Sequence, residues 1–248
     1  MVGLRCLGSF MEFEDRAVAF IDVLGFKALV NGAVENEAKK QKLADLVALL
    51  ESAIPRLDAG VDPDAPKHLI PRHQYISDCI ILSAPLADTK WPWYNGVSVI
   101  VMRAIQLSHF FLNEGYLVRG GISAGKLWHT ETNIVGPAYQ EAYLLEAEGN
   151  EPRVQLHSHA LQHWDGGSRM CLREGNVSFV NGLFDFYIPN NTRHGVIEAT
   201  YEKYELFATE ALDSNLPNSA KDKWRWFRRF LQSEKPEGLK WAAAQPGT

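Results

Sequence analysis

Apolar positions follow two periods along the chain, and the alternation between them predicts both strands and helices. Short apolar runs indicate strands, whereas apolar residues spaced three and four apart, as along 36–54, indicate helices. Pro55 is expected to end that helix, and the segment 58–66, with three acids, two prolines and a glycine, to be a loop. Strands are predicted over 16–22, 68–75, 79–84, 117–124 (with 126–129 as an extension), 154–156, 177–180 and 184–188, and helices over 27–32, 36–54, 97–113, 138–147, 194–212 and 220–232.

The order of these elements predicts the fold class. The first 150 residues give strand, helix, hairpin, helix, strand and helix, an order typical of a ferredoxin-like α+β sandwich with helices on one face of an antiparallel sheet. An α/β extension is expected after it. We expect an N-terminal extension over 1–15, a main domain over 16–190 and a helical extension over 191–248 packed on the same domain.

Composition and charge exclude several classes of function. The net charge of −5 disfavours non-specific nucleic-acid binding, which needs a basic surface. Three cysteines form no disulfide framework and fit a reducing cytosol. No apolar stretch approaches the roughly 20 residues that span a bilayer, and the first ten residues do not resemble a secretory signal. We therefore expect a cytoplasmic protein without a membrane segment, and Met11 is an alternative start to Met1.

Two aspartates interrupt apolar, strand-forming runs, and they are the strongest functional signal in the sequence. Asp22 lies within 19–26 and Asp78 within 74–82. A carboxylate in such a run is costly unless it is paired or binds a cation. In a ferredoxin-like sheet the first strand lies beside the hairpin, so the two acids are expected to share a site for Mg²⁺ or Mn²⁺. The alternatives are a helix N-cap for Asp22 and a hairpin-turn residue for Asp78.

The turn after Asp22 predicts an anion site. Val23, Leu24, Gly25 and Phe26 connect a strand to a helix, where successive backbone N–H groups can face a phosphate. Glycine allows the backbone to come close to such a ligand.

Four segments in order resemble the motifs of class III nucleotidyl cyclases. The first two are the metal motifs around Asp22 and Asp78, the third is 118–125 (VRGGISAG), and the fourth is 136–146 (GPAYQEAYLLE). The resemblance covers roughly 16–148 and does not firmly include the C-terminal hundred residues. It implies a homodimer with two sites at the interface, and two divalent ions held by Asp22, Asp78 and the carbonyl of Val23.

Departures from that pattern bear on the substrate. Gln74 stands where purine cyclases place a base reader, Pro137 follows the glycine of the last motif, Gln140 replaces an asparagine and Leu144 replaces the transition-state arginine. The variant is similar to bacterial pyrimidine cyclases of Pycsar antiphage systems, whose cyclic UMP or cyclic CMP activates an effector. Phe20 is expected to pack against the base. The resemblance favours UTP slightly over CTP, and a catalytically silent cyclase-homology domain is the rival interpretation.

The expected chemistry follows from two bound metals. One would activate the ribose 3′-hydroxyl for in-line attack on the α-phosphate, and the other would hold the β- and γ-phosphates and neutralise pyrophosphate. Arg119 either binds phosphate, replacing the arginine missing at Leu144, or serves as a structural ion-pair partner. Lys126 is a weaker phosphate candidate.

Two further segments suggest chemistry but have simpler explanations. His157, His159 and His163 have no cysteine or acid at ligand spacing along the chain, so no zinc site is expected there. The segment 223–230 (KWRWFRRF) mixes bases and aromatics, and is expected to be a packing helix with a basic outer face.

Overall fold

The computed structural model describes residues 11–164 and 168–235, so the predictions for Cys6, the start at Met1 and the C-terminal tail lie outside the described residues. The helices are α1 Phe26–Ala33, α2 Glu37–Asp58, α3 Gly96–Leu112, α4 Pro137–Glu148, α5 Ser158–Leu161, α6 Val196–Asp213 and α7 Asn218–Ser233. The strands are β1 Glu14–Val23, β2 Arg72–Ile76, β3 Cys79–Pro85, β4 Val118–His129, β5 Ile134–Val135, β6 Val154–Leu156, β7 Cys171–Glu174 and β8 Val177–Val180.

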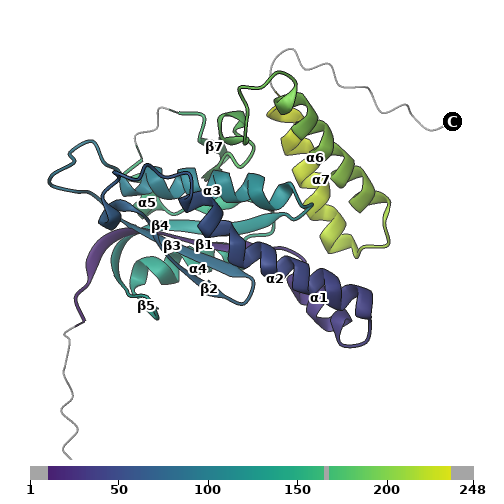
Figure 1. Ribbon diagram of the computed structural model, residues 1–248, viewed down its shortest axis with the longest axis horizontal. Helices are drawn as coiled ribbons and strands as arrows, with labels where there is room; N and C mark the ends of the chain where they lie inside the picture. The colour runs from purple at the N-terminus through teal and green to yellow at the C-terminus, as the bar shows by residue number, and fades with distance from the viewer. Residues whose placement is uncertain (1–10, 165–167, 236–248) are drawn as a thin grey trace, which may run out of the picture.

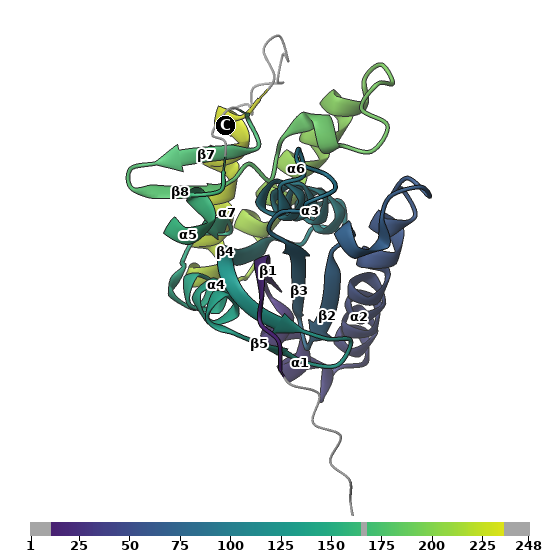
Figure 2. The ribbon, with the colours of Figure 1, turned by 90° about the vertical axis from the view of Figure 1, so that its left-hand side faces the viewer.

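The sheet confirms the predicted α+β class. Its strand order is β2-β3-β1-β4-β6-β8-β7, with β5 paired to β4. Strands β1 to β4 are antiparallel in the order β2-β3-β1-β4, which is the ferredoxin-like arrangement. Strand β6 then pairs parallel to β4, and the β7–β8 hairpin follows it. The extension therefore continues the same sheet (Figure 2).

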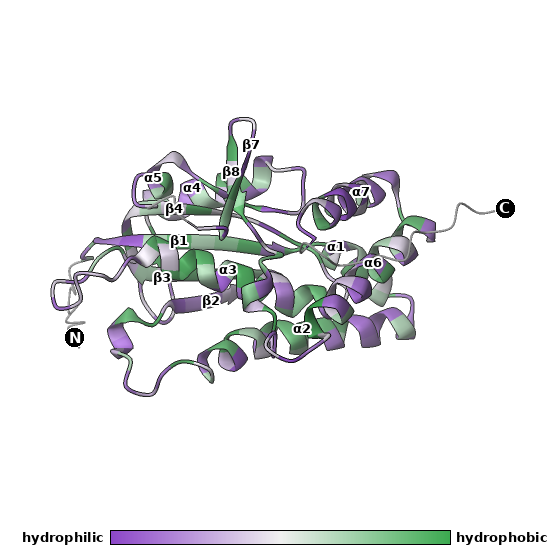
Figure 3. Ribbon diagram, turned by 90° about the horizontal axis from the view of Figure 1, so that it is seen from above, coloured by the Kyte–Doolittle hydropathy of each residue, from purple (hydrophilic) through white to green (hydrophobic). Residues whose placement is uncertain are grey.

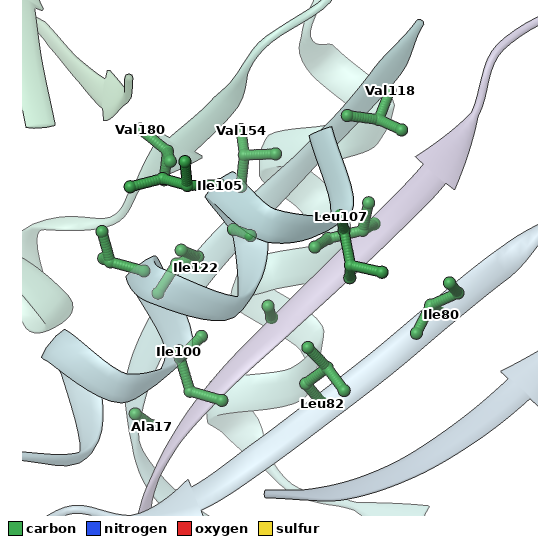
Figure 4. Packing of buried hydrophobic residues seen from close by; sticks show 14 of the residues in the cluster. Ala17, Ile80, Leu82, Ile100, Ile105, Leu107, Val118, Ile122, Val154 and Val180 are labelled. Atoms are coloured by element: carbon green, nitrogen blue, oxygen red, sulfur yellow. The ribbon is translucent and has the colours of Figure 1, made fainter. Parts of the chain in front are cut away.

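Alternation along β1 separates the core into two layers. Ala17, Ala19 and Ile21 face one cluster with residues of α2 and α3. Val18 and Phe20 face the opposite side, where α4 covers them. The prediction of helices on one face was therefore incomplete, because α3 and α4 lie on opposite sides of the sheet (Figure 1). Figure 4 shows the first layer, in which α3 packs over β1, β3 and β4.

Edge and centre of the sheet differ in polarity. Strands β1 and β3 are hydrophobic along most of their length, whereas β2 at the edge is hydrophilic (Figure 3). A polar edge strand disfavours pairing with another chain through that edge.

Helix α2 does not end at Pro55 as predicted; it continues to Asp58. Proline lacks an N–H, so the carbonyl four residues earlier, that of Glu51, loses its helical partner. The hydroxyl of Tyr75 in β2 lies 3.4 Å from that carbonyl oxygen and donates to it. A tertiary contact thus satisfies the group that the proline leaves free, which no local pattern in the sequence could indicate.

Two predicted strands differ from the structure. The predicted strand 184–188 contains a 3₁₀ turn over Asp185–Tyr187, and the predicted strand 68–75 begins with a 3₁₀ turn over Lys67–Leu69, so that β2 starts only at Arg72. Elements β5, β7 and α5 were not predicted. Strand β4 runs without a break from Val118 to His129, so the suggested extension of that strand is confirmed.

Helices α6 and α7 form a second apolar cluster with the end of α3 and with Leu117, which precedes β4, at one end of the molecule (Figure 1). Phe227 and Leu231 of α7 are buried, and Arg228 forms an ion pair with Glu205 of α6 at 2.5 Å. The segment 223–230 is therefore a packing helix, as predicted. The domain boundary at 190 remains a prediction. Along the described residues, no helix is both long enough and apolar enough to cross a bilayer.

Candidate metal and nucleotide site

Sheet register brings Asp22 into one row with Cys79 and Arg119. Asp22 pairs with Cys79 of β3 on one side and with Arg119 of β4 on the other. Directly paired residues of an antiparallel sheet project to the same face. These three side chains therefore lie on the face that α4 covers, at the end of β1.

Asp78 reaches the same place from the β2–β3 turn. Ser77, with φ of 58°, and Asp78 form that turn, and the carbonyl of Asp78 accepts a hydrogen bond from Val23 N at 3.2 Å. Ligand atoms of Asp22, Asp78 and Cys79 lie within 4.8 Å of one another. Asp78 is thus a turn residue, as one alternative held, and also a neighbour of Asp22.

Asp22 is not the helix N-cap that the other alternative proposed. Gly25 occupies the N-cap position of α1, with φ of 98°. Its left-handed backbone is the conformation in which glycine avoids the Cβ penalty. Asp22 remains in β1, three residues earlier.

Burial beside other carboxylates raises the pKa of Asp22 to about 7. Burial is the largest cause, followed by the negative charges of Asp78 and Glu146, while Arg119 opposes the shift. Burial, followed by the negative charges of Asp22 and Asp78, raises the pKa of the Cys79 thiol, so this side chain is a neutral thiol beside the two acids when no metal is bound.

Arg119 is held by an ion pair. Its Nε donates to Glu146 Oε1 at 2.8 Å, its Nη2 contacts the same oxygen, and its Nη1 donates to the carbonyl of Gly149 at 2.8 Å. The distance from Nη2 to Asp22 Oδ2 is 3.8 Å. In this structure Arg119 is thus a structural ion-pair partner, which is one of its two predicted roles. The other role, phosphate binding, stays a prediction.

The donor set fits a hard divalent cation. Two carboxylates face each other at a half-buried position, and both burial and the repulsion between them, which together raise the pKa of Asp22, are offset by a bound cation. Carboxylate oxygens suit Mg²⁺ and Mn²⁺.

The strand-to-helix turn offers a smaller anion site than predicted. The N–H of Leu24 donates to the carbonyl of Leu117 at 2.9 Å and is therefore occupied. The first bond within the helix runs from Leu29 N to Gly25 O, so the N–H groups of Gly25 and Phe26 precede the helical ladder. The predicted anion site is therefore reduced to the backbone N–H groups of Gly25 and Phe26.

Residues predicted for the base pocket are not all brought together. Gln74 lines a groove of about 470 Å³ between β2 and the β4–β5 turn, which Tyr139 also lines. Phe20 shares a sheet row with Gln74 through Ile81, but its ring is 5% exposed and lies against Tyr139 of α4.

The other two predicted pocket residues lie on α4. Pro137 begins this helix and Gln140 is exposed on it, and neither lines the groove. Leu144, at the position of the missing arginine, is 51% exposed beside the exposed Tyr143. Lys126 forms an exposed ion pair with Asp15 at 2.9 Å.

Sequence reasoning missed two parts of the site. Glu146 is buried together with Ala138 and Ala142, at intervals of four residues on α4, so this spacing was the available signal for its inward position. The role of the glycine pair in 118–125 was also missed. A Cβ on Gly121 would lie 2.3 Å from the carbonyl oxygen of Ala142, so only glycine allows α4 to approach β4 this closely.

No protein-family model and no curated protein sequence matches this chain. Among solved structures, the chain is similar to the catalytic core of a rhodopsin-guanylyl cyclase with converted specificity in complex with ATPαS. That match has 16% identity and a TM-score of 0.43, covering 68% of this chain and 96% of the other. A class III adenylyl cyclase-like ATP-binding protein from Pseudomonas aeruginosa is similar at 11% identity and a TM-score of 0.44, covering 86% of this chain and 43% of that one. The chain thus spans less than half of the second protein, and identities this low say nothing of what it acts on.

Proposed function

We propose that this chain is a nucleotidyl cyclase that converts UTP into 3′,5′-cyclic UMP and pyrophosphate. The observation that carries the proposal is the convergence of Asp22 and Asp78, 56 positions apart (78 − 22), at one half-buried point of a ferredoxin-like sheet. The four motifs in cyclase-like order over 16–148 support the reaction class.

Asp22 and Asp78 would hold two Mn²⁺ or Mg²⁺ ions, and the Val23 carbonyl would complete one ligand shell. When bound, such ions activate the 3′-hydroxyl and neutralise the charge of the triphosphate. Gly25 and Phe26, at the start of α1, would bind the triphosphate through their backbone N–H groups. Arg119 is the candidate for additional stabilisation of the phosphate charge.

The pyrimidine assignment rests on the variant motif and on the groove beside Gln74. The amide of Gln74 carries both a donor and an acceptor, so it can pair with a uracil or a cytosine edge. In this structure its Nε2 donates to Thr130 O at 3.4 Å, a long contact that a base can replace at low cost. Cytidylate cyclase activity, giving cyclic CMP, is the nearest alternative.

The resemblance also supports a cellular setting. We propose a cytoplasmic homodimer in which the exposed Tyr143 and Leu144 of α4 lie near the subunit interface. Its cyclic nucleotide would act as a second messenger in antiphage defence by activating a separate effector. Neither nucleic acid nor a membrane is expected as a partner.

The deciding experiment is incubation of the purified chain with Mn²⁺ and equimolar UTP, CTP, ATP and GTP. Cyclic UMP with stoichiometric pyrophosphate is the expected product. Cyclic CMP would correct only the base, whereas a purine product would overturn the pyrimidine assignment. Asp22→Ala and Asp78→Ala are expected to abolish turnover while leaving the circular dichroism spectrum unchanged, and normal activity in either would refute the metal assignment.

One observation favours a catalytically silent, nucleotide-binding domain as the second candidate. Leu144 offers no charge, and Arg119 is engaged by Glu146 and Gly149. Loss of a charge-stabilising group often costs a few kcal/mol of transition-state stabilisation. Saturable nucleotide binding without any pyrophosphate release would support this alternative.

A further inference from the structure

A second group of metal-binding side chains lies outside the site of Asp22 and Asp78. Glu141 of α4 faces His157, which precedes α5, and His159 within α5. Glu141 Oε2 lies 3.3 Å from His157 Nδ1 and 3.0 Å from His159 Nδ1. The two imidazole ring centroids are 4.7 Å apart. Helix α4 and the β6–α5 junction are thus side by side (Figure 2).

No zinc site was expected from the sequence, because no acid lies at ligand spacing from His157, His159 or His163 along the chain. The fold removes this premise, because it places Glu141, sixteen positions before His157 (157 − 141), between the two imidazoles. His163, the third histidine of the segment, does not belong to the group.

Glu141 Oε2 accepts a hydrogen bond from Ser123 Oγ at 2.6 Å and lies 3.0 Å from His159 Nδ1. His157 Nδ1 accepts a hydrogen bond from the backbone N–H of His159 at 3.4 Å, and therefore does not donate to the carboxylate that lies 3.3 Å from it. Two atoms that both carry lone pairs thus face each other. A cation bound by the carboxylate and both Nδ1 atoms removes this repulsion.

The distances match a small tetrahedral cation. Zinc binds imidazole nitrogen and carboxylate oxygen at about 2.0–2.2 Å, which places neighbouring ligand atoms about 3.4 Å apart in a tetrahedron. The separations of 3.0 and 3.3 Å come close to that value, and ligand atoms of all three residues lie within 4.8 Å of one another. We propose that Glu141, His157 and His159 bind Zn²⁺, with water as the fourth ligand.

Three features complete the proposed site. Ser123 is fully buried and fixes the carboxylate, as groups behind metal ligands commonly do. The side chain of His159 is 49% exposed, so the ion has access from solvent. Two nitrogens and one oxygen favour zinc over magnesium, unlike the all-carboxylate pair of Asp22 and Asp78.

Calorimetric titration of the metal-free protein with Zn²⁺ tests the proposal. The double variant Asp22→Asn/Asp78→Asn provides the background, so that zinc bound at those acids is not counted. One Zn²⁺ per chain is expected, with a rise in the thermal unfolding midpoint when zinc is in excess. His157→Ala, His159→Ala and Glu141→Gln are each expected to weaken binding by at least about 100-fold, and Ser123→Ala by about 10-fold.

The matched control is His163→Ala, which is expected to retain full affinity. Substitution of Co²⁺ for Zn²⁺ gives a direct reading of geometry, because visible absorption of tetrahedral intensity is expected and should vanish in His159→Ala. Circular dichroism checks that each variant is folded. Equal affinity in His159→Ala and the control, or no stoichiometric binding in the background variant, would overturn the zinc site and leave the cyclase proposal unaffected.

Discussion

Replacement of Arg119 separates the two roles that this residue can have. Arg119→Met removes the charge while keeping an unbranched apolar chain. Glu146, whose side chain is 9% exposed, then loses the guanidinium that neutralises it, and the carbonyl of Gly149 loses a donor. The carboxylates of Asp22 and Asp78 lie nearby and repel the unpaired charge, and no other cation among the described residues forms an ion pair with Glu146.

The structure sets the size of the effect. Removal of one partner from a buried ion pair typically costs about 3–5 kcal/mol, because the remaining charge stays desolvated. Arg119 is only 20% exposed, so solvent screens this pair weakly. We therefore expect Arg119→Met to lower the free energy of unfolding by about 3 kcal/mol. Arg119→Met/Glu146→Met removes both charges, and is expected to recover most of that loss.

Urea unfolding of the unaltered chain, both single variants and the double variant measures the coupling, provided that the four m-values agree. Turnover of UTP in the double variant then identifies the role. A structural residue predicts recovery of activity along with stability, whereas a residue that stabilises phosphate charge predicts a stable but inactive protein. If Arg119→Met costs less than about 1 kcal/mol, the ion-pair reasoning is wrong.

Three further changes test separate parts of the structure. Asp22 has a pKa of about 7 in the folded protein and 3.8 as its ordinary value, so the stability that its neutral form contributes below pH 3.8 is lost as the pH rises through about 7. Asp22→Asn stays neutral, and in metal-free buffer it should therefore be more stable than the unaltered chain above pH 7. Burial lowers the pKa of His109 from 6.5 to about 4, so stability present above pH 6.5 should fall as pH drops towards 4, with a shallower slope in His109→Gln, measured by urea unfolding. Gly121→Ala should cost about 1–3 kcal/mol, because its Cβ would meet a backbone carbonyl, whereas Gly60→Ala, with its nearest contact at 3.6 Å, should cost little.

The fold could be predicted largely because periodicity and element order were both clear. Strands β1 and β3 carry continuous apolar runs, and α3 has apolar residues at helical spacing, so local patterns and tertiary packing agree there. Pro55 failed as a helix end because Tyr75, twenty positions away (75 − 55), supplies the missing donor. Such compensation depends on tertiary structure and leaves no local signal.

The site was only partly predictable for the same reason. Asp22 and Asp78 were found because a carboxylate in an apolar strand has few explanations other than a partner or a cation. Glu141 and Glu146 lie in a polar-looking helix, where exposed glutamates are common, so their partners on β4 and near α5 could be found only from the three-dimensional structure.

Strand β4 and helix α4 give the motif 118–125 a physical meaning that the resemblance alone does not supply. Arg119, Gly121 and Ser123 alternate along β4 and so project to one face. On that face Arg119 pairs with Glu146, Gly121 provides space for the backbone of α4, and Ser123 donates to Glu141. Each position therefore fixes one part of α4, and the helix in turn positions both the charges near Asp22 and the proposed zinc ligand. Substitutions in this motif should consequently disturb the site of Asp22 and Asp78 through the placement of α4, although Arg119 alone of the three forms an ion pair with Asp22 in the described part of the chain.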